Sequence, residues 1–278
     1  MKKFSLLVAA AAGLGLPTAA LAQNSDRSDD FNGFYVSGTI GTTAQNNDGS
    51  STVVFDTNRD GTFNETVVTS TGANAFSPGF CNGFSAANAP GGCRGDTNGL
   101  EYGVRLGYDA RLSNNLVAGV LIEGSKSNAK DGTSAFSTTP AGYSFDRSLD
   151  YAVSARARLG FTPGGGGLFY ITGGGSYAKV DHTFSTTNTA NSFTPMNDGK
   201  MVWGWQAGGG AEVLLSKNLS LGVEYLYNRY NDDEYYVAVG QGTAGATNPF
   251  VLAGGVNMRP SETRYDYHSL RATLSFRF

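Results

Sequence analysis

Apolar and polar residues alternate in several stretches of about ten residues, and the clearest stretch ends the sequence. Even positions 270–278 carry Leu, Ala, Leu, Phe and Phe, and odd positions 269–277 carry Ser, Arg, Thr, Ser and Arg. Successive side chains of a β-strand point to opposite faces, so this pattern predicts a strand with one apolar and one charged face.

Seven further stretches are compatible with strands, although glycines dilute the first and the fifth. They are 33–41, 101–111, 116–123, 149–161, 168–179, 203–215 and 219–228. The connections alternate in length. Those at 112–115, 162–167 and 216–218 are short and rich in turn residues, whereas 42–99, 126–146, 181–199 and 231–266 are long. Short turns at one end and long loops at the other are typical of a transmembrane β-barrel.

The N-terminal residues predict export. Lys2 and Lys3 precede an apolar run from Phe4 to Leu16, and Ala20-Leu21-Ala22 resembles a cleavage site. We therefore expect a signal peptide at 1–22, a short periplasmic segment at 23–32 and a barrel over 33–278. A membrane anchor is the weaker alternative, because the apolar run is rather short for a spanning helix.

The composition agrees with this interpretation. The 278 residues include 39 Gly and 33 aromatics, only 15% are charged, and the net charge is −3. This balance disfavours helical bundles, acidic disordered chains and nucleic-acid partners. A secreted soluble sandwich or barrel remains an alternative, since alternation alone does not distinguish inside from outside. Small residues on the charged face, terminal Phe278 and the unequal loops favour charges in a narrow lumen.

Several segments resemble a known family. Phe31-Asn32-Gly33-Phe34-Tyr35-Val36 is similar to the first strand of the small bacterial outer membrane protein beta-barrel domain family, which is OmpA-like in its membrane part. Segments 103–108, 155–161 and 274–278 are similar to its second, fourth and eighth strands. The resemblance implies an all-β, eight-stranded antiparallel up-and-down barrel in the outer membrane of a Gram-negative bacterium, with long extracellular loops. It also implies contact with lipid and lipopolysaccharide, and assembly by the barrel-assembly machinery with Phe276 and Phe278 as a C-terminal signal.

The inward-facing charges are the main candidate site. The expected lumen network is Glu101, Arg105, Glu123, Asp150, Arg156, Arg158, Glu212, Glu224, Arg271 and Arg277, and Asp109 and Arg111 share that face. Buried charges persist only when paired, so we expect arginine–carboxylate bridges. An eight-stranded barrel is just wide enough for side chains to fill it, which favours a structural plug over a gated pore.

Two loop features suggest further chemistry. Cys81 and Cys93 both lie in the first long loop, and an oxidising compartment makes a disulfide the default expectation. The run Asp56 to Gly61 resembles the start of a calcium loop, but position twelve is Val67 instead of Glu. We interpret it as a hairpin with an acidic turn and expect no metal or other cofactor. The acidic run Asp232 to Glu234 is interpreted as a solvated loop tip.

The sequence favours a non-enzymatic protein. His182 and His268 are the two histidines, and adjacent His268 and Ser269 would point to opposite faces of a strand. No nucleophile elbow, zinc-protease motif or phosphate loop is present. We expect a protein of envelope integrity and surface-loop presentation, with possible adhesion to an unknown surface ligand. A narrow porin is the first alternative, and a lipid-modifying outer-membrane enzyme is the second.

Overall fold

The computed structural model describes residues 30–45, 51–76, 95–139, 141–163 and 166–278. Within these ranges, eight long strands form a closed antiparallel barrel. In chain order they are β1 (Gly33–Gln45), β3 (Gly99–Arg111), β4 (Leu116–Ser127), β6 (Ala141–Phe161), β7 (Gly167–Thr186), β9 (Met201–Leu214), β10 (Leu219–Asn231) and β13 (Arg264–Arg277). The pairing β4–β6 closes the sheet, and β1 pairs with β13. The fold expected from the alternation is confirmed.

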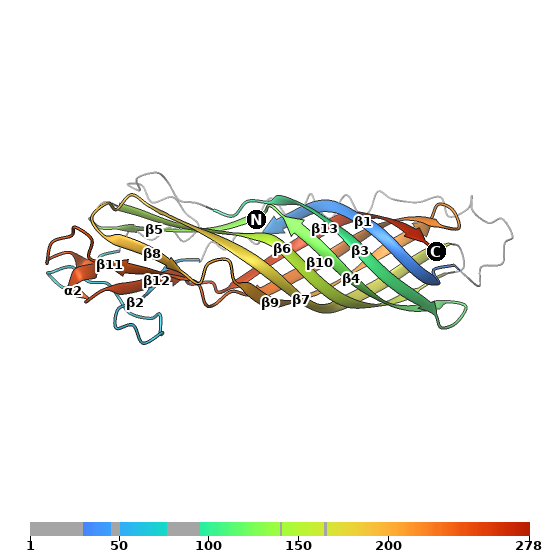
Figure 1. Ribbon diagram of the computed structural model, residues 1–278, viewed down its shortest axis with the longest axis horizontal. Coiled ribbons are helices and arrows are strands. Elements are labelled where there is room, and N and C mark those ends of the chain that lie inside the picture. The colour runs from blue at the N-terminus through green and yellow to red at the C-terminus, as the bar shows by residue number, and fades with distance from the viewer. Residues whose placement is uncertain (1–29, 46–50, 77–94, 140, 164–165) are drawn as a thin grey trace.

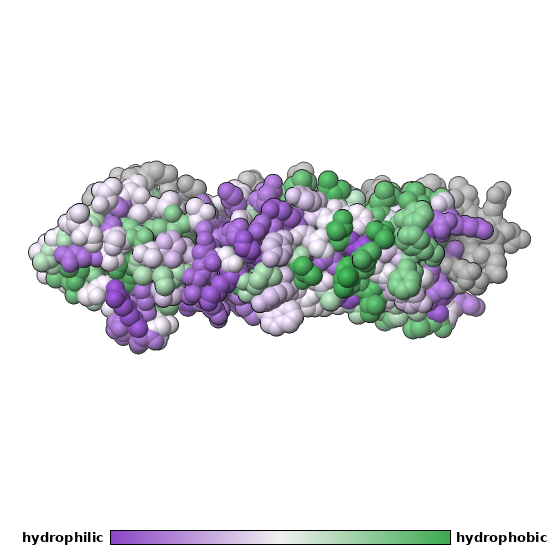
Figure 2. Space-filling view, viewed as in Figure 1, coloured by the Kyte–Doolittle hydropathy of each residue, from purple (hydrophilic) through white to green (hydrophobic). Residues whose placement is uncertain are grey.

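The barrel buries its polar face. Along β13, Arg271, Ser275 and Arg277 are buried, while Leu274 and Phe276 are about half exposed. A water-soluble barrel would show the opposite arrangement, so the outward surface matches a lipid environment. Figure 2 shows a hydrophobic surface over the barrel, and a hydrophilic belt separates it from the other end of the molecule. Among the described residues, no helix is long and apolar enough to cross a membrane.

The segments expected as loops contain additional ordered elements. The long hairpin β6–β7 continues beyond the barrel, and β5 (Lys130–Ser137) pairs with β6. A second sheet has the order β2-β12-β11-β8. Its strands are β2 (Val53–Asp56), β8 (Ser192–Met196), β11 (Tyr236–Gly240) and β12 (Val256–Pro260), and the short helix α2 (Pro249–Leu252) follows β11. We call this assembly, with the outer halves of β6 and β7, the extension. In Figure 1 it lies opposite the C-terminal end of the barrel.

The extension has its own apolar core. Tyr143 and Phe145 on β6 are buried, and so are Val237 on β11 and Met258 on β12. The Phe76 ring lies 5.4 Å from the ring of Tyr143, centroid to centroid. Short strands that alternate over only four or five residues are weak sequence patterns, which explains why most of them were not identified individually.

A close packing contact inside the barrel explains one of the glycines. Tyr35 on β1 is paired with Gly107 on β3, and its ring lies over that glycine. A Cβ atom at position 107 would stand 2.2 Å from Cζ of Tyr35, whereas a Cβ at outward-facing Gly38 would meet nothing within 4 Å. Inward glycines therefore make room for large side chains of neighbouring strands.

We expect Gly107→Ala to destabilise the barrel by about 1–3 kcal/mol, because the added methyl group displaces a buried ring. The matched variant Gly38→Ala should change stability by less than about 0.5 kcal/mol. Urea unfolding in lipid vesicles measures both values. The folded fraction is determined from the different gel mobilities of the folded and unfolded forms, which we call the gel shift. Equal stability of the two variants would contradict this packing argument.

Candidate functional site

The lumen contains a central layer of buried ion pairs. Glu224 on β10 is completely buried and lies 2.7 Å from Arg105 on β3, 3.2 Å from Arg156 on β6 and 2.7 Å from Arg271 on β13. It also accepts a hydrogen bond of 2.9 Å from the hydroxyl of Tyr170 on β7. One carboxylate therefore links five strands.

Two further carboxylates balance the three arginines of this layer. Glu123 on β4 lies 2.7 Å from Arg105, 2.9 Å from Arg156 and 2.7 Å from Arg271. Glu101 on β3 lies 3.1 Å from Arg271. We call these residues the central layer: Glu101, Arg105, Glu123, Arg156, Glu224 and Arg271. Three positive charges face three carboxylates in a space closed to solvent.

A second group, which we call the lower layer, lies toward the short turns. Arg158 on β6 pairs with Asp109 on β3 and, at 3.2 Å, with Glu212 on β9. Arg277 on β13 pairs with the same two carboxylates at 2.8 and 2.7 Å. The guanidinium groups of Arg158 and Arg277 lie 4.7 and 4.9 Å from the centre of the Tyr35 ring. Four charges and an aromatic ring fill the barrel at this level.

Tyrosines fill the lumen on the other side of the central layer. Tyr230, Tyr265 and Tyr267 are fully buried, and the rings of Tyr230 and Tyr267 stack at 6.4 Å. The Tyr230 hydroxyl lies 3.0 Å from the hydroxyl of Ser176 and accepts a hydrogen bond from Gln206 at 3.3 Å. The lumen is thus occupied by side chains at three successive levels.

Asp150 does not belong to this network, so that part of the expectation is wrong. The β6–β7 register shifts between Leu149 and Tyr151, and a bulge of this kind reverses which positions face inward. Leu149 is therefore buried, and Asp150 points outward to Lys126 at 2.8 Å and Lys179 at 3.0 Å. The other nine residues of the expected network lie in the central and lower layers.

Arg111 lies at the short-turn end of the barrel instead of in the lumen network. Its guanidinium group donates to the carbonyl oxygens of Asp30 at 2.7 Å and Asn114 at 2.5 Å. Because Asn114 belongs to the short turn after β3, Arg111 ties that turn to the segment that enters β1.

The two C-terminal phenylalanines lie on the outer surface. Phe276 and Phe278 are exposed, and their ring centroids are 5.2 Å apart. Their proposed role in assembly remains a prediction. The expected disulfide between Cys81 and Cys93 falls outside the described residues.

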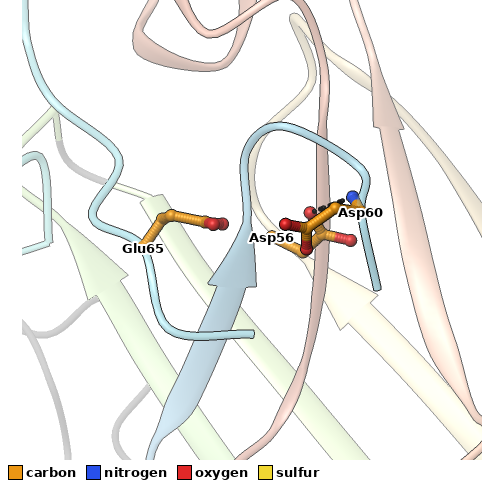
Figure 3. A group of neighbouring side chains, drawn as sticks. All are labelled: Asp56, Asp60 and Glu65. Atoms are coloured by element: carbon orange, nitrogen blue, oxygen red, sulfur yellow. Dashed lines mark hydrogen bonds between the residues drawn. The ribbon is translucent and has the colours of Figure 1, made fainter. Parts of the chain in front are cut away.

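The acidic turn of the extension is organised by hydrogen bonds. Carboxylate oxygens of Asp56, Asp60 and Glu65 lie within 4.8 Å of one another. Figure 3 shows the three side chains. The Asp56 carboxylate accepts from the backbone N–H of Asp60 and of Gly61, each at 3.1 Å. Glu65 accepts from the N–H of Thr57 at 2.8 Å. These contacts account for the turn.

Sequence reasoning missed a buried cluster at the base of the extension. Asp232, expected in a solvated tip, is buried, lies 2.8 Å from Nε2 of His182 and pairs with Arg147 at 3.2 Å. Arg147 also pairs with Asp131 at 2.6 Å, and the Tyr235 ring stacks on His182 at 3.9 Å. These residues are far apart in sequence, and no local pattern reveals that they meet.

The pKa of the Asp232 carboxyl lies below its ordinary value of 3.8. Burial raises the pKa, but the hydrogen bond and charge of His182, together with the charge of Arg147, lower it by more. The ionised form is therefore the one that the folded extension prefers.

The second histidine lies on the outer wall of the barrel. His268 is 2.6 Å from the hydroxyl of Tyr225, while neighbouring Ser269 is buried in the lumen. The two side chains lie on opposite faces, as the alternation predicts, and they do not form a nucleophile–base pair.

Comparison with known proteins gives a consistent result. A sequence model of the family described as outer membrane protein beta-barrel domain matches residues 6–278. The 31 kDa outer-membrane immunogenic proteins of Brucella melitensis and Brucella suis are each 27% identical over 180 residues, which is 65% of this chain and 67% of theirs. Among solved structures, the outer membrane protein OprG of Pseudomonas aeruginosa has a TM-score of 0.49 and 10% identity, covering 91% of this chain and 100% of OprG.

We expect Glu224→Ala to destabilise the barrel by about 3–5 kcal/mol, because it leaves three buried arginines facing only two carboxylates, so that one buried positive charge has no counter-charge. Glu234→Gln, which breaks an exposed pair with Lys200, serves as the control and should cost less than about 1 kcal/mol. Urea unfolding in lipid vesicles compares them. A barrel that tolerates Glu224→Ala as well as the control would refute the energetic importance of the central layer.

Acid should loosen the base of the extension. A carboxyl group with a depressed pKa stabilises the fold above its unfolded value and loses that contribution as pH falls through the folded value. Hydrogen-exchange protection factors at residues 232–239, which correct for the intrinsic pH dependence of exchange, should therefore fall below about pH 4. Asp232→Asn should show low protection factors already at pH 7 and less change with pH. Protection factors that are equally high in both proteins at every pH would contradict this role.

Proposed function

Because this chain belongs to the outer membrane protein beta-barrel domain family, it is an outer-membrane β-barrel protein, and we propose that it is a non-enzymatic envelope protein with a closed lumen. In this proposal the barrel anchors the molecule in the membrane. The extension is the part that the cell presents to its surroundings.

The packing of the lumen carries this proposal. The charged residues of the central and lower layers are each less than 5% exposed, although they belong to six different strands. A channel filled with water would leave several of these groups solvated. Two ion-paired layers and a layer of tyrosines follow one another along the axis, so a solute would have to displace all three.

The extension supports a role in surface presentation. It has a packed apolar core instead of solvated loops, so it offers a surface of fixed shape. Binding usually resides in connections that a rigid scaffold holds in place. The Brucella relatives are named immunogenic outer-membrane proteins, which agrees with an exposed surface in this chain. Lipid and lipopolysaccharide would surround the barrel, and the assembly machinery of the outer membrane would insert it.

We expect the purified protein to give no stable unitary conductance in planar bilayers at neutral pH. Charge-balanced variants test whether the side chains of these layers keep the lumen closed. Arg271→Ser with Glu224→Ser removes one ion pair from the central layer, and Arg158→Ser with Glu212→Ser removes one ion pair from the lower layer. Each pair alone should remain closed because the other two layers persist, while the four changes combined with Tyr230→Ser and Tyr267→Ser, which thin the tyrosine layer, should open a pathway.

The gel shift of the folded form verifies that each variant still folds. Reproducible conductance steps from the unmodified protein would overturn the closed lumen and favour the narrow porin.

A further inference from the structure

A cavity of about 290 Å³ lies where the barrel ends and the extension begins. This volume is near the lower end of the range for small-molecule sites, and it suits a ligand built on one ring. Its lining combines the end of β7, the connection into β9 and the connection after β10. The residues that matter most are His182, Asn197, Lys200, Trp203, Asp233 and Tyr235.

Two aromatic residues line the cavity. Trp203 is 65% exposed on the outer wall of the barrel, and the Tyr177 ring contacts it edge-on at 5.5 Å. Tyr235 is buried and its ring lies flat against His182. One aromatic surface therefore faces the surroundings of the barrel and the other lies deeper, and aromatic faces of this kind attract C–H-rich rings and nearby cations.

The polar groups of the cavity include one carboxylate that forms no ion pair. Lys200 pairs with Glu234 at 2.7 Å, and Asn197 donates to the Glu234 carbonyl oxygen at 2.9 Å. Asp232 is neutralised by Arg147. Arg259 donates to the backbone carbonyl oxygen of Asp233 at 2.6 Å. Within the described part of the chain, the exposed Asp233 carboxylate itself makes no salt bridge, so it can accept a cationic group.

The deeper wall contains an unused hydrogen-bonding group. The Tyr235 hydroxyl is buried and has no hydrogen-bond partner among the described residues. Buried hydroxyl groups normally have a partner, so one without a protein partner, in the wall of a cavity, points to a polar ligand.

We propose that this cavity binds an amine-bearing sugar ring. The ring face would pack on an aromatic wall, its ammonium group would pair with Asp233, and its hydroxyls would bond to Asn197, Lys200 and Tyr235. The source is either the headgroup of a glycolipid beside the barrel or a free amino sugar at the cell surface. This inference does not depend on whether the lumen is closed.

The two tryptophans of the chain allow a direct test. Trp205→Phe leaves Trp203 as the reporter at the cavity, and Trp203→Phe leaves Trp205, which packs on Tyr227 at 5.4 Å outside it. Glucosamine is titrated into each variant in detergent. We expect a saturable change in Trp203 emission and none in Trp205 emission, with the gel shift confirming that both variants fold.

Charge variants test the role of the amine. In the Trp203 reporter, Asp233→Asn should weaken glucosamine binding about tenfold, the effect of losing one charge-assisted contact. N-acetylglucosamine, which lacks the positive charge, should bind equally weakly with or without that change. Asp60→Asn, on the distant acidic turn, serves as the matched control and should have no effect.

A further comparison separates the two sources. In phosphatidylcholine vesicles, a glycolipid whose sugar carries a free amine should compete with glucosamine far more strongly than the same amino sugar in solution if the ligand is a lipid headgroup, and no more strongly if the ligand is a free sugar. A Trp203 response that does not saturate, or that Trp205 shares, would overturn the proposal. So would a response that Asp233→Asn leaves unchanged.

Discussion

Complete pairing of the charges inside the barrel is the constraint on which the rest of the structure depends. Three arginines and three carboxylates of the central layer come from five strands, and none of them contacts solvent. A slip of one residue in any strand would turn its charges toward lipid, and a slip of two would leave partners unpaired. The ion pairs therefore specify the register of the whole barrel as well as filling its lumen.

The same constraint explains the glycine-rich, charge-poor composition. A narrow lumen that holds arginine and tyrosine side chains has no room for a further side chain at every inward position. Gly107 lies under the Tyr35 ring, and a Cβ at Gly210 would stand 2.7 Å from the Tyr170 hydroxyl. Both tyrosines in turn contact Arg158. Small residues, large aromatic residues and arginines thus depend on one another across neighbouring strands.

How much of the structure the sequence could predict depends on how far apart in the sequence the interacting residues lie. Alternation is a property of neighbouring residues, so it identified all eight barrel strands and the inward position of Glu224 or Arg271. It failed at Asp150, because a bulge changes the parity without leaving a local sequence pattern. It also failed for Asp232, whose partners His182 and Arg147 come from distant segments. Contacts of this kind depend on how the outer halves of β6 and β7 and the segment that follows β10 pack together at the base of the extension.

Strand β6 shows how the surroundings determine the two faces of one strand. Below the bulge, Ser154, Arg156 and Arg158 face inward, and Val153 and Leu159 face outward. Beyond the bulge the polarity inverts. There Tyr143, Phe145 and Leu149 face inward together with the ion-paired Arg147, while the outward positions 144, 146, 148 and 150 carry Ser, Asp, Ser and Asp.

An apolar outer face is stable only beside lipid, and a polar one only beside water, so the inversion places the edge of the hydrocarbon layer near Asp150. Lys126 and Lys179 pair with Asp150 on that outer surface. The outer face of β6 therefore contacts lipid along the part that belongs to the barrel, and water along the part that belongs to the extension. The bulge between the two parts allows each to turn its proper face inward.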